Sequence, residues 1–409
     1  MMKYVIITPR VSSMGGAQLY VLRRSLHLKR LGYEVHIVVA NHSDDYYPLK
    51  EKFDNIPIYI IPETGLRLAQ VSKKNQEKLL TNLLNEVGKS ESYYVESHTL
   101  YAVEWGEILS AKCNARHLAY LLGVQPISAY KFQPGLRIFD EKLLKGEFYG
   151  CSSVSLAKIF DREDVPSNYI NIGYDEKEMA DQSVPAINYS KQVGDYVITT
   201  ITRFDKTYIE PLADAVAELA HKYEKQRFVL LLVGSCPNQK RVDYLKSNYN
   251  NERYKQSNLD IRYLGYIDVL GKDIFELSDV FVGMGTASIN AISQQCITIN
   301  IDPRGGMTKA SGVFGVDTMN FGYSENGSLY SIFSKIEEVF LFDNNRIRQI
   351  KDSGRALFEN EFEVEACFRK LDAVMDSLEK TNDRPSLKVS VFYRLLVRYS
   401  VKIRHGLKK

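Results

Sequence analysis

The chain has 409 residues, of which 44% are hydrophobic and 25% are charged, so its composition is that of an ordinary globular protein. This length predicts two domains, and no apolar run approaches the roughly 20 residues that a helix needs to span a bilayer. The formal net charge is +3, but residues 384–409 contain eight Lys and Arg and no acid. Removing those eight from the 53 basic residues leaves 45 against 50 acidic ones, so the basic character belongs to the tail.

The five cysteines are scattered, odd in number and without a C-x-x-C pair. This pattern favours a reducing compartment, the cytoplasm, and argues against a zinc site. The first residues, MMKYVIITPR, predict a β-strand rather than a signal peptide, because the apolar run is short and its flanks are wrong for a signal.

The first half of the chain alternates apolar strand-like runs with helix-like segments. A glycine-bearing loop, 12-SSMGGAQ-18, leads into a helix over about 17–31, and Gly32 stands where a helix C-terminal glycine belongs. We expect strands at 3–8, 33–40, 57–61, 92–97, 117–122 and 147–151.

A second series of the same kind follows a polar, unperiodic segment at 179–194, which predicts a linker. We expect strands at 195–202, 227–233, 260–264, 279–283 and 297–301, and helices near 208–224, 271–277 and 286–294. Alternating strands and helices indicate an α/β protein with two Rossmann-like domains, 1–178 and 195–375, whose doubly wound parallel sheets face each other across a cleft.

Three glycine turns follow strands: 14-MGGAQ-18, 234-GSCPNQ-239 and 283-GMGTAS-288. In doubly wound sheets ligands bind at the carboxyl ends of strands, where a helix N-terminus offers free N–H groups to an anion. In the third turn, Thr286 and Ser288 are candidates to cap the helix or to donate to a phosphate. The alternative, that the glycines only make tight connections, stays open for each turn.

Two cations stand after the strand 195–202, in 196-YVITTITRFDK-206. Arg203 can bind a phosphate in bidentate fashion and Lys206 acts as a point charge. A solvated basic pair is the alternative, but the neighbouring glycine turns favour a diphosphate site. No D-x-D motif ends a strand, so we expect no metal and no separate cofactor.

Taken in order, the G-G-A loop, T-R-F-D-K, L-L-V-G-S, Y-L-G-Y-I and SDVFVGMGTASINAISQQCITIN resemble retaining GT-B glycosyltransferases, especially family 4, over most of residues 1–375. The resemblance implies transfer of a sugar from a nucleotide-sugar donor, with Arg203 and Lys206 neutralising the diphosphate. It implies that Gly15 and Gly16 approach the donor, and that the Tyr263–Ile267 segment, including Tyr266 and Ile267, holds the base. The remaining donor-binding candidates are Gly234, Gly283, Gly285, Thr286, Ala287, Ser288 and Asn290.

The chain departs from the family at two positions. Many relatives have a glutamate where Val282 and Asn290 stand, and the resemblance implies that those acids contact the donor sugar and ribose. Asn290 can still bond a ribose hydroxyl, whereas Val282 offers a sugar nothing. Retaining enzymes of this fold need no pair of catalytic carboxylates, unlike glycoside hydrolases, so charge stabilisation by Arg203 and Lys206 remains a sufficient hypothesis.

His98 follows the expected strand at 92–97, and the resemblance implies that the acceptor binds there. His98 is therefore a candidate to orient the acceptor hydroxyl, with a loop histidine bonded to backbone as the alternative. Glu96 and Glu104 are equally open. His36 is expected to be structural, and His27 and His117 have no evident partner.

The tail 386–409 places Val391, Leu395 and Tyr399 on one helical face and Arg394 and Arg398 largely on the other. That pattern predicts an interfacial helix attracted to anionic lipid. The alternative is a helix that returns to the first domain, for which 361–379 also qualifies. Nucleic-acid binding is not indicated.

The sequence therefore predicts a retaining, metal-independent hexosyltransferase that uses a UDP-sugar in preference to a GDP-sugar and acts on a glycan or lipid-linked acceptor. It is expected in the cytoplasm, peripheral to the membrane. A non-catalytic GT-B partner subunit or glycan-binding protein is the alternative that Val282 and Asn290 support. A nucleotide-sugar epimerase is a third candidate. A dinucleotide oxidoreductase is disfavoured, because the first loop lacks G-x-G-x-x-G.

Overall fold

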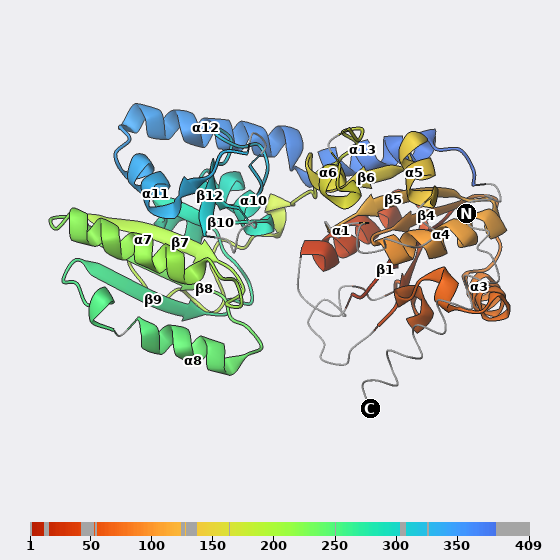
Figure 1. The fold of residues 1–409 in the computed structure, drawn as a ribbon, viewed down its shortest axis with the longest axis horizontal. Coiled ribbons are helices and arrows are strands. Elements are labelled where there is room, and N and C mark those ends of the chain that lie inside the picture. Colours follow the sequence, from red (N-terminus) through yellow and green to blue (C-terminus); the bar gives the residue numbers. More distant parts are fainter. Residues whose placement is uncertain are drawn as a thin grey trace. The chain divides into compact units, whose positions relative to one another are not determined.

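The computed structural model describes residues 2–11, 16–41, 53, 55–123, 127, 137–162, 164–249, 251–302, 308–324 and 327–381. They divide into two compact units, shown in Figure 1. The residues up to Ile172, with those from Cys367 onward, form the first unit, and Gly173–Ala366 form the second. The tail at 386–409 lies outside the described residues.

The first unit contains a six-stranded sheet in the order β3-β2-β1-β4-β5-β6, in which all neighbours are parallel. Each strand agrees with its predicted range to within one residue at either end, because short apolar runs that are buried on both faces mark a parallel sheet clearly. The strands are β1 (Lys3–Thr8), β2 (Glu34–Val39), β3 (Ile58–Ile60), β4 (Tyr93–Ser97), β5 (Arg116–Leu121) and β6 (Phe148–Gly150).

Helices connect these strands, and side-chain caps begin two of them. Ser72 accepts a hydrogen bond from the backbone N–H of Asn75, and Thr99 accepts one from that of Ala102. The helices are α1 (Gly16–Arg30), α3 (Lys73–Val87), α4 (Leu100–Cys113), α5 (Arg137–Leu144) and α6 (Ser155–Phe160), with 3-10 turns at Pro62–Gly65 and Leu68–Gln70.

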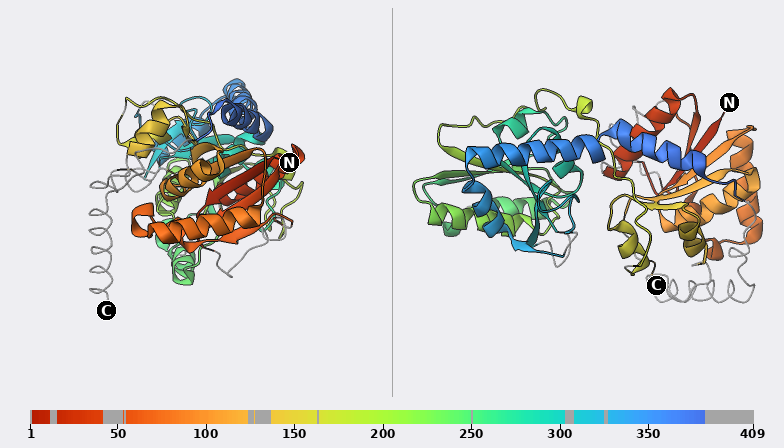
Figure 2. Two further views of the ribbon diagram at one scale, coloured as in Figure 1. Left: turned by 90° about the vertical axis from the view of Figure 1, so that its right-hand side faces the viewer. Right: turned by 90° about the horizontal axis from the view of Figure 1, so that it is seen from above.

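The helix α13 (Val364–Ser377) carries the chain back to the first unit. The ring of Phe368 packs against Tyr20 and His27 of α1, beside which α13 lies in Figure 2. Just after the helix, the carbonyl of Leu378 accepts a hydrogen bond from Arg116 Nε at 2.8 Å. The returning element is therefore within the earlier of the two candidate segments, 361–379.

The second unit contains a seven-stranded sheet in the order β13-β12-β11-β10-β7-β8-β9. Its five parallel strands were predicted to within one residue, whereas the antiparallel β12 and β13 were not predicted. The strands are β7 (Asp195–Ile201), β8 (Arg227–Val233), β9 (Leu259–Gly265), β10 (Val280–Gly283), β11 (Ile297–Ile301), β12 (Lys309–Val313) and β13 (Tyr330–Ser331). The helices are α7 (Ile209–Lys222), α8 (Gln239–Asn248), α9 (Asp273–Leu277), α10 (Thr286–Ser293), α11 (Ile332–Phe340) and α12 (Asn344–Glu361), with 3-10 turns at Glu176–Glu178 and Glu252–Tyr254.

The segment 179–194, expected to be a linker, packs onto the second unit. Val184 forms a bridge with Val269, and the carboxylate of Asp273 accepts hydrogen bonds from the backbone N–H and the hydroxyl of Ser183. Met179 and Tyr189 join the apolar core. The compact units divide at 172/173 and 366/367, and polar residues of 179–194 bond to distant partners within the second unit. The domain boundaries expected at 178 and 375 stay a prediction.

In both sheets the strand order reverses once beside a central strand. The chain runs outward from β1 through β2 to β3, and then continues on the other side of β1 with β4, β5 and β6. The second sheet does the same, with β8 and β9 on one side of β7 and β10 and β11 on the other. Such a reversal leaves a crevice at the carboxyl ends of the two central strands, which are β1 and β4 in one sheet and β7 and β10 in the other.

A charged cluster is buried where α4 crosses the first sheet. His117 Nδ1 lies 2.8 Å from Glu107 Oε2, and His117 Nε2 lies 2.9 Å from the hydroxyl of Ser97. The ammonium of Lys142 donates to Glu107 at 2.9 Å and to Glu147 at 2.8 Å. Any side chain larger than hydrogen at Gly106 would overlap with Ser97 and His117, so a glycine lets the helix approach the sheet here.

Burial, together with the positive charge of Lys142, lowers the pKa of His117 from 6.5 to about 4, so this imidazole is neutral in the folded protein at neutral pH. The unfolded chain binds a proton on this group below pH 6.5 and the folded chain does not. The stability linked to it is therefore complete above pH 6.5 and is lost as the pH falls from 6.5 towards 4.

We expect His117→Gln to make the first unit less sensitive to acid. Between pH 7 and pH 5 the free energy of unfolding of the unaltered chain should fall by about 2 kcal/mol more than that of the variant. Urea unfolding followed by the fluorescence of Trp105 measures this, because the only tryptophan of the chain is buried in α4 of the same unit. Equal pH dependence in the two proteins would contradict the assignment.

Candidate functional site

The second unit brings four of the predicted site segments, two of them glycine turns, to one edge of its sheet. Because β10, β7, β8 and β9 are consecutive parallel neighbours, the residues after them follow one another along the carboxyl edge. The switch point of this sheet, where ligands of doubly wound folds generally bind, lies between the residues after β7, which include Arg203 and Lys206, and those after β10, which include Gly285 and Thr286. The turns after β8 and β9, with Gly234 and Tyr266, lie beyond β7.

The loop that carries the two cations is anchored by the residue between them. The ring of Phe204 is buried, its N–H donates to Ser235 O at 3.0 Å, and its carbonyl accepts from Arg241 Nε at 3.1 Å. The side chain of Arg203 is 64% exposed and pairs with Asp205 at 3.1 Å. Lys206 is half-buried and has no ion-pair partner among the described residues. The loop held by Phe204 therefore carries Arg203, whose charge is paired with Asp205, and Lys206, whose charge has no ion-pair partner among the described residues.

The turn after β10 bonds some of its amide groups within the protein and leaves others without a backbone acceptor among the described residues. Gly285 has φ +71°, a conformation that favours glycine, and a Cβ there would meet nothing within 4 Å. Its N–H donates to Phe321 O at 2.7 Å, so this amide is already satisfied. The N–H groups of Thr286 and Ala287 open α10 and have no backbone acceptor within the described ranges.

One of the two roles expected of Thr286 and Ser288, capping of α10, is wrong, whereas donation to a phosphate stays a prediction. Neither Thr286 nor Ser288 caps α10, because the N-cap residue is Gly285 and no side chain bonds there. Ser288 is fully buried, and its hydroxyl has no partner in the described part of the chain. The Oδ1 atom of Asn290 is likewise buried and unbonded to described residues, which leaves an acceptor in the first turns of α10.

Close packing explains two other glycines. A Cβ at Gly234 would overlap with the carbonyl of Thr202, and the N–H of Gly234 donates to Gly265 O at 2.7 Å. A Cβ at Gly283 would overlap with the ring of Phe281. Val282 is fully buried in the apolar core, so its side chain does not reach the crevice. The tight-connection alternative therefore accounts for Gly234 and Gly283.

The end of β9 presents one exposed and one buried residue. Tyr266 is 45% exposed, whereas Ile267 is only 8% exposed and packs in the core. Ile267 also lines a cavity of about 490 Å³ that runs along β9 beside Pro185–Asn188. Lys246 was not singled out from the sequence. Its ammonium lies 4.3 Å from the ring centre of Tyr263, and Tyr263 packs against Phe204.

In the first unit, His98 and Gly16 stand at the switch between β1 and β4. Gly15 lies outside the described residues, and Gly16 begins α1. The backbone N–H of His98 donates to Ile7 O at 3.1 Å, and its side chain is only 2% exposed. His98 Nε2 lies 2.8 Å from Glu96 Oε1, and Nδ1 has no partner among the described residues. Among the described residues the ring of His98 bonds to a carboxylate, whereas its backbone N–H bonds to backbone, as expected from the alternative of a loop histidine bonded to backbone.

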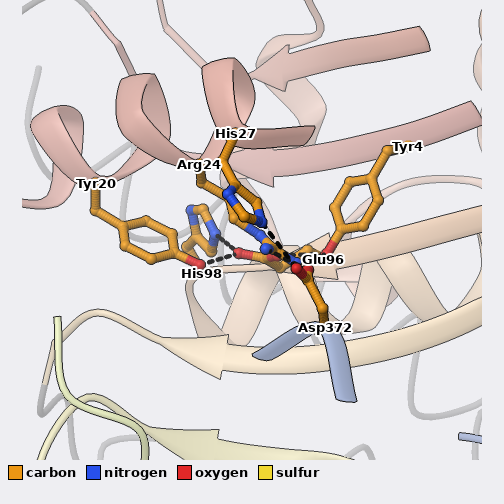
Figure 3. A network of polar contacts seen from close by, with 7 residues as sticks. All are labelled: Tyr4, Tyr20, Arg24, His27, Glu96, His98 and Asp372. Atoms are coloured by element: carbon orange, nitrogen blue, oxygen red, sulfur yellow. Dashed lines mark hydrogen bonds and ion pairs between the residues drawn. The ribbon is translucent and has the colours of Figure 1, made fainter. Parts of the chain in front are cut away.

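Glu96 is the centre of a buried network, shown in Figure 3. Its carboxylate accepts hydrogen bonds from the hydroxyls of Tyr4 and Tyr20, each at 2.6 Å, and from Arg24 Nε at 3.3 Å. Burial by itself raises the pKa of Glu96, but the hydrogen bond from His98 and the charge of Arg24 lower it to about 2. Glu96 is therefore a carboxylate throughout the physiological range.

Asp372 of α13 completes this network. It accepts from Arg24 Nη1 at 2.6 Å and pairs with His27 Nε2 at 2.8 Å, which supplies the partner for His27 that the sequence did not reveal. The ion pair joins residues 348 positions apart, so no local pattern indicates it.

Two other buried groups are structural. Ser97, His117 and Glu107 have the hydrogen-bond order of a hydrolase triad, but they are fully enclosed and Gly106 packs directly on them, so no substrate can reach Ser97. Glu104 binds Arg67 Nε at 3.0 Å and the N–H of Leu68 at 2.8 Å, which holds a 3-10 turn onto α4.

The described residues contain no cluster of three His, Cys, Asp or Glu side chains that could hold a metal ion. Within the same part of the chain, none of the helices has both the length and the apolar character needed to cross a membrane.

Comparisons with known proteins identify the architecture. No protein-family model and no curated protein matches the sequence. Solved structures do match: HepE of Anabaena in complex with UDP and glucose has 14% identity and a TM-score of 0.61, over 92% of this chain and 100% of that one. A glycosyltransferase from Rickettsia africae has 15% identity and a TM-score of 0.64, over 95% and 99%.

A third match is the sucrose-phosphate synthase of Thermosynechococcus elongatus, with 15% identity and a TM-score of 0.61, over 92% of this chain and 98% of that one. These likenesses span both units, and they confirm the predicted pair of Rossmann-like domains. The chain therefore has the GT-B fold.

Proposed function

We propose that the chain is a glycosyltransferase that moves a hexose from a UDP-sugar to a glycan or lipid-linked acceptor, with retention of configuration and without a metal ion. One observation carries the proposal: Arg203 and Lys206 follow β7 and the N-terminus of α10 follows β10, and these are the two neighbouring strands at the switch point of the second sheet. Structures with the same fold, HepE among them, were solved with UDP.

The chemistry of this edge suits a diphosphate. Lys206 is a cation without an ionic partner in the described part of the chain, and Arg203 is exposed enough to exchange Asp205 for a phosphate. The free amides of Thr286 and Ala287 add the positive end of the α10 dipole. When the glycosidic bond breaks, the negative charge that develops on the UDP leaving group is stabilised there, and one such donor contributes about 3 kcal/mol.

The proposed retaining mechanism also agrees with the absence of unpaired acidic side chains among the candidate donor residues. Among the residues after β7, β8 and β10 that we assign to the donor, none is acidic, and Asp205 is engaged by Arg203. These candidate donor residues therefore do not supply a pair of carboxylates of the glycosidase type. Leaving-group stabilisation is the chemistry that remains, and the buried Oδ1 of Asn290 is a candidate acceptor for a ribose hydroxyl.

The second candidate function is a GT-B partner subunit without catalysis. Val282 and Asn290 favour it, since glutamates that the resemblance implies at these positions are absent. Turnover of UDP-glucose by the purified chain separates the two: a catalyst releases UDP, whereas a partner subunit releases none.

We expect Arg203→Ala/Lys206→Ala to weaken UDP binding by at least about a hundredfold, because each of the two charge-assisted hydrogen bonds to a phosphate contributes about 1.5–3 kcal/mol. Calorimetric titration with UDP and GDP measures this. Arg253→Ala/Lys255→Ala is the matched control, since it removes an exposed Arg and Lys from the 3-10 turn before β9. Equal losses in both variants would exclude a specific site, and failure of the folded chain to bind either nucleotide would exclude the enzyme.

Cys236 provides a test that needs no turnover. It is half-buried and stands after β8, beside the anchored Phe204 loop, whereas Cys151, Cys296 and Cys367 are buried. Burial raises the pKa of Cys113 to about 12, so that thiol reacts slowly. We expect UDP to slow the reaction of Cys236 with a maleimide and to leave that of Cys113 unchanged, as measured by peptide mass spectrometry. Protection that survives in Arg203→Ala/Lys206→Ala would contradict the placement.

The tail at 386–409 is proposed to bind anionic membranes. Because α13 already returns the chain to the first unit, residues 386–403 are not needed for that purpose. Replacing Arg394, Arg398, Arg404 and Lys408 by Gln should weaken binding to phosphatidylglycerol vesicles by roughly a thousandfold, at about 1 kcal/mol for each charge. Co-sedimentation measures this, with phosphatidylcholine vesicles as the control; equal binding of both proteins would refute the proposal.

A further inference from the structure

His98 presents a buried ring nitrogen that no described residue satisfies. The imidazole stands at the carboxyl end of β4, and its Nδ1 atom is buried without a partner among the described residues, while Nε2 is bonded to Glu96. Buried polar atoms of a native protein nearly always have a hydrogen-bond partner, and an unsatisfied one at a sheet switch point calls for an explanation. A ligand atom is the explanation that this position favours.

The partner of Nε2 determines what Nδ1 can do. Arg24 keeps Glu96 ionised, and an ionised carboxylate only accepts hydrogen bonds. Nε2 must therefore carry a hydrogen and donate it to Glu96. In the neutral ring Nδ1 then holds a lone pair, which accepts a hydrogen bond from an O–H group and cannot donate one.

We propose that Glu96 is a positioning residue that holds His98 in the Nε2–H tautomer, so that Nδ1 accepts a hydrogen bond from a sugar hydroxyl of the substrate. The inference rests on the proposed function for the identity of the ligand. Glu96 itself touches no substrate: it acts through His98, and it is fully buried.

The surroundings of the pair hold its geometry. The ring of Tyr20 lies edge-on to His98 at 5.3 Å between centres, while its hydroxyl donates to the same Glu96 oxygen as His98 does. The other oxygen of Glu96 faces Tyr4 and Arg24, and Arg24 is held in turn by Asp372. The carboxylate thus cannot rotate away from His98 without breaking several bonds, as Figure 3 shows.

Glu96→Gln tests the tautomer directly. Arg24 Nε has a hydrogen and cannot accept, so the amide oxygen has to stay on the side of Arg24 and the NH₂ group turns towards Tyr20 and His98. His98 Nε2 must then accept, which moves the ring hydrogen to Nδ1. Long-range ¹H–¹⁵N NMR of the full chain, with His98 assigned by comparison with His98→Gln, reports which ring nitrogen is protonated.

We expect an unprotonated Nδ1 in the unaltered chain and a protonated Nδ1 in Glu96→Gln. Glu104→Gln is the matched control, because Glu104 is also a buried, arginine-paired carboxylate of the first unit, and it should leave His98 unchanged. Turnover of UDP-glucose should fall at least about tenfold in Glu96→Gln and not in Glu104→Gln. Tyr20→Phe keeps the ring and removes one donor to Glu96, so it should preserve the tautomer, and it serves if Glu96→Gln does not fold.

Three ligands identify the source of the hydroxyl. A shift of His98 Nδ1 with UDP-glucose but not with UDP assigns the donor sugar, and a shift with methyl glucoside assigns the acceptor side. No shift with either sugar, while UDP binds, overturns the sugar contact. A protonated Nδ1 in the unaltered chain, or an unchanged tautomer in Glu96→Gln, overturns the role of Glu96. Failure to bind UDP rejects the proposed function instead, and leaves the tautomer result standing.

Discussion

The single reversal of strand order beside β7 is the constraint on which the candidate donor site depends. Because β8 and β9 extend on one side of β7 and β10 and β11 on the other, the connections that leave β7 and β10 run apart and leave the carboxyl ends of these strands uncovered. Arg203 and Lys206 follow one strand and the amides of α10 follow the other. Without the reversal, the same residues would be spread along the edge of a sheet with no crevice to share.

A second constraint governs the first unit: every buried charge there has to be matched. Separating a carboxylate from its partner in the interior costs several kcal/mol. Two networks of buried ion pairs in the first unit avoid this cost. One places Lys142 between Glu107 and Glu147, and the other places Arg24 between Glu96 and Asp372. In the first network both ring nitrogens of His117 are bonded, and a Cβ at Gly106 would overlap with Ser97 and His117. The second ends in His98, whose Nδ1 stays unmatched among the described residues.

This difference separates two arrangements that look alike in outline. Both contain a histidine bonded to a buried glutamate: His98 directly follows β4, and His117 lies near the start of the neighbouring β5. His117 is bonded at both ring nitrogens and enclosed, and burial together with Lys142 lowers its pKa to about 4, so it acts as a structural group. His98 is bonded at one nitrogen only, in the position where the fold admits a ligand. Geometry around the second nitrogen, rather than the glutamate–histidine pair itself, distinguishes the functional candidate.

The sequence by itself determined the parallel strands, the main helices and the positions of the glycine turns and cations, because apolar periodicity and glycine conformation are local properties of the chain. It did not determine that the segment 179–194 packs on the second unit, that β12 and β13 join the sheet, or that Val282 faces the core. Nor did it reveal the partners of His27 and His98. Those features depend on which distant residues satisfy a buried polar group, and Asp372 reaches Arg24 across 348 positions only after both helices have packed. Only the tertiary structure determines which distant residue becomes the partner of a buried polar group.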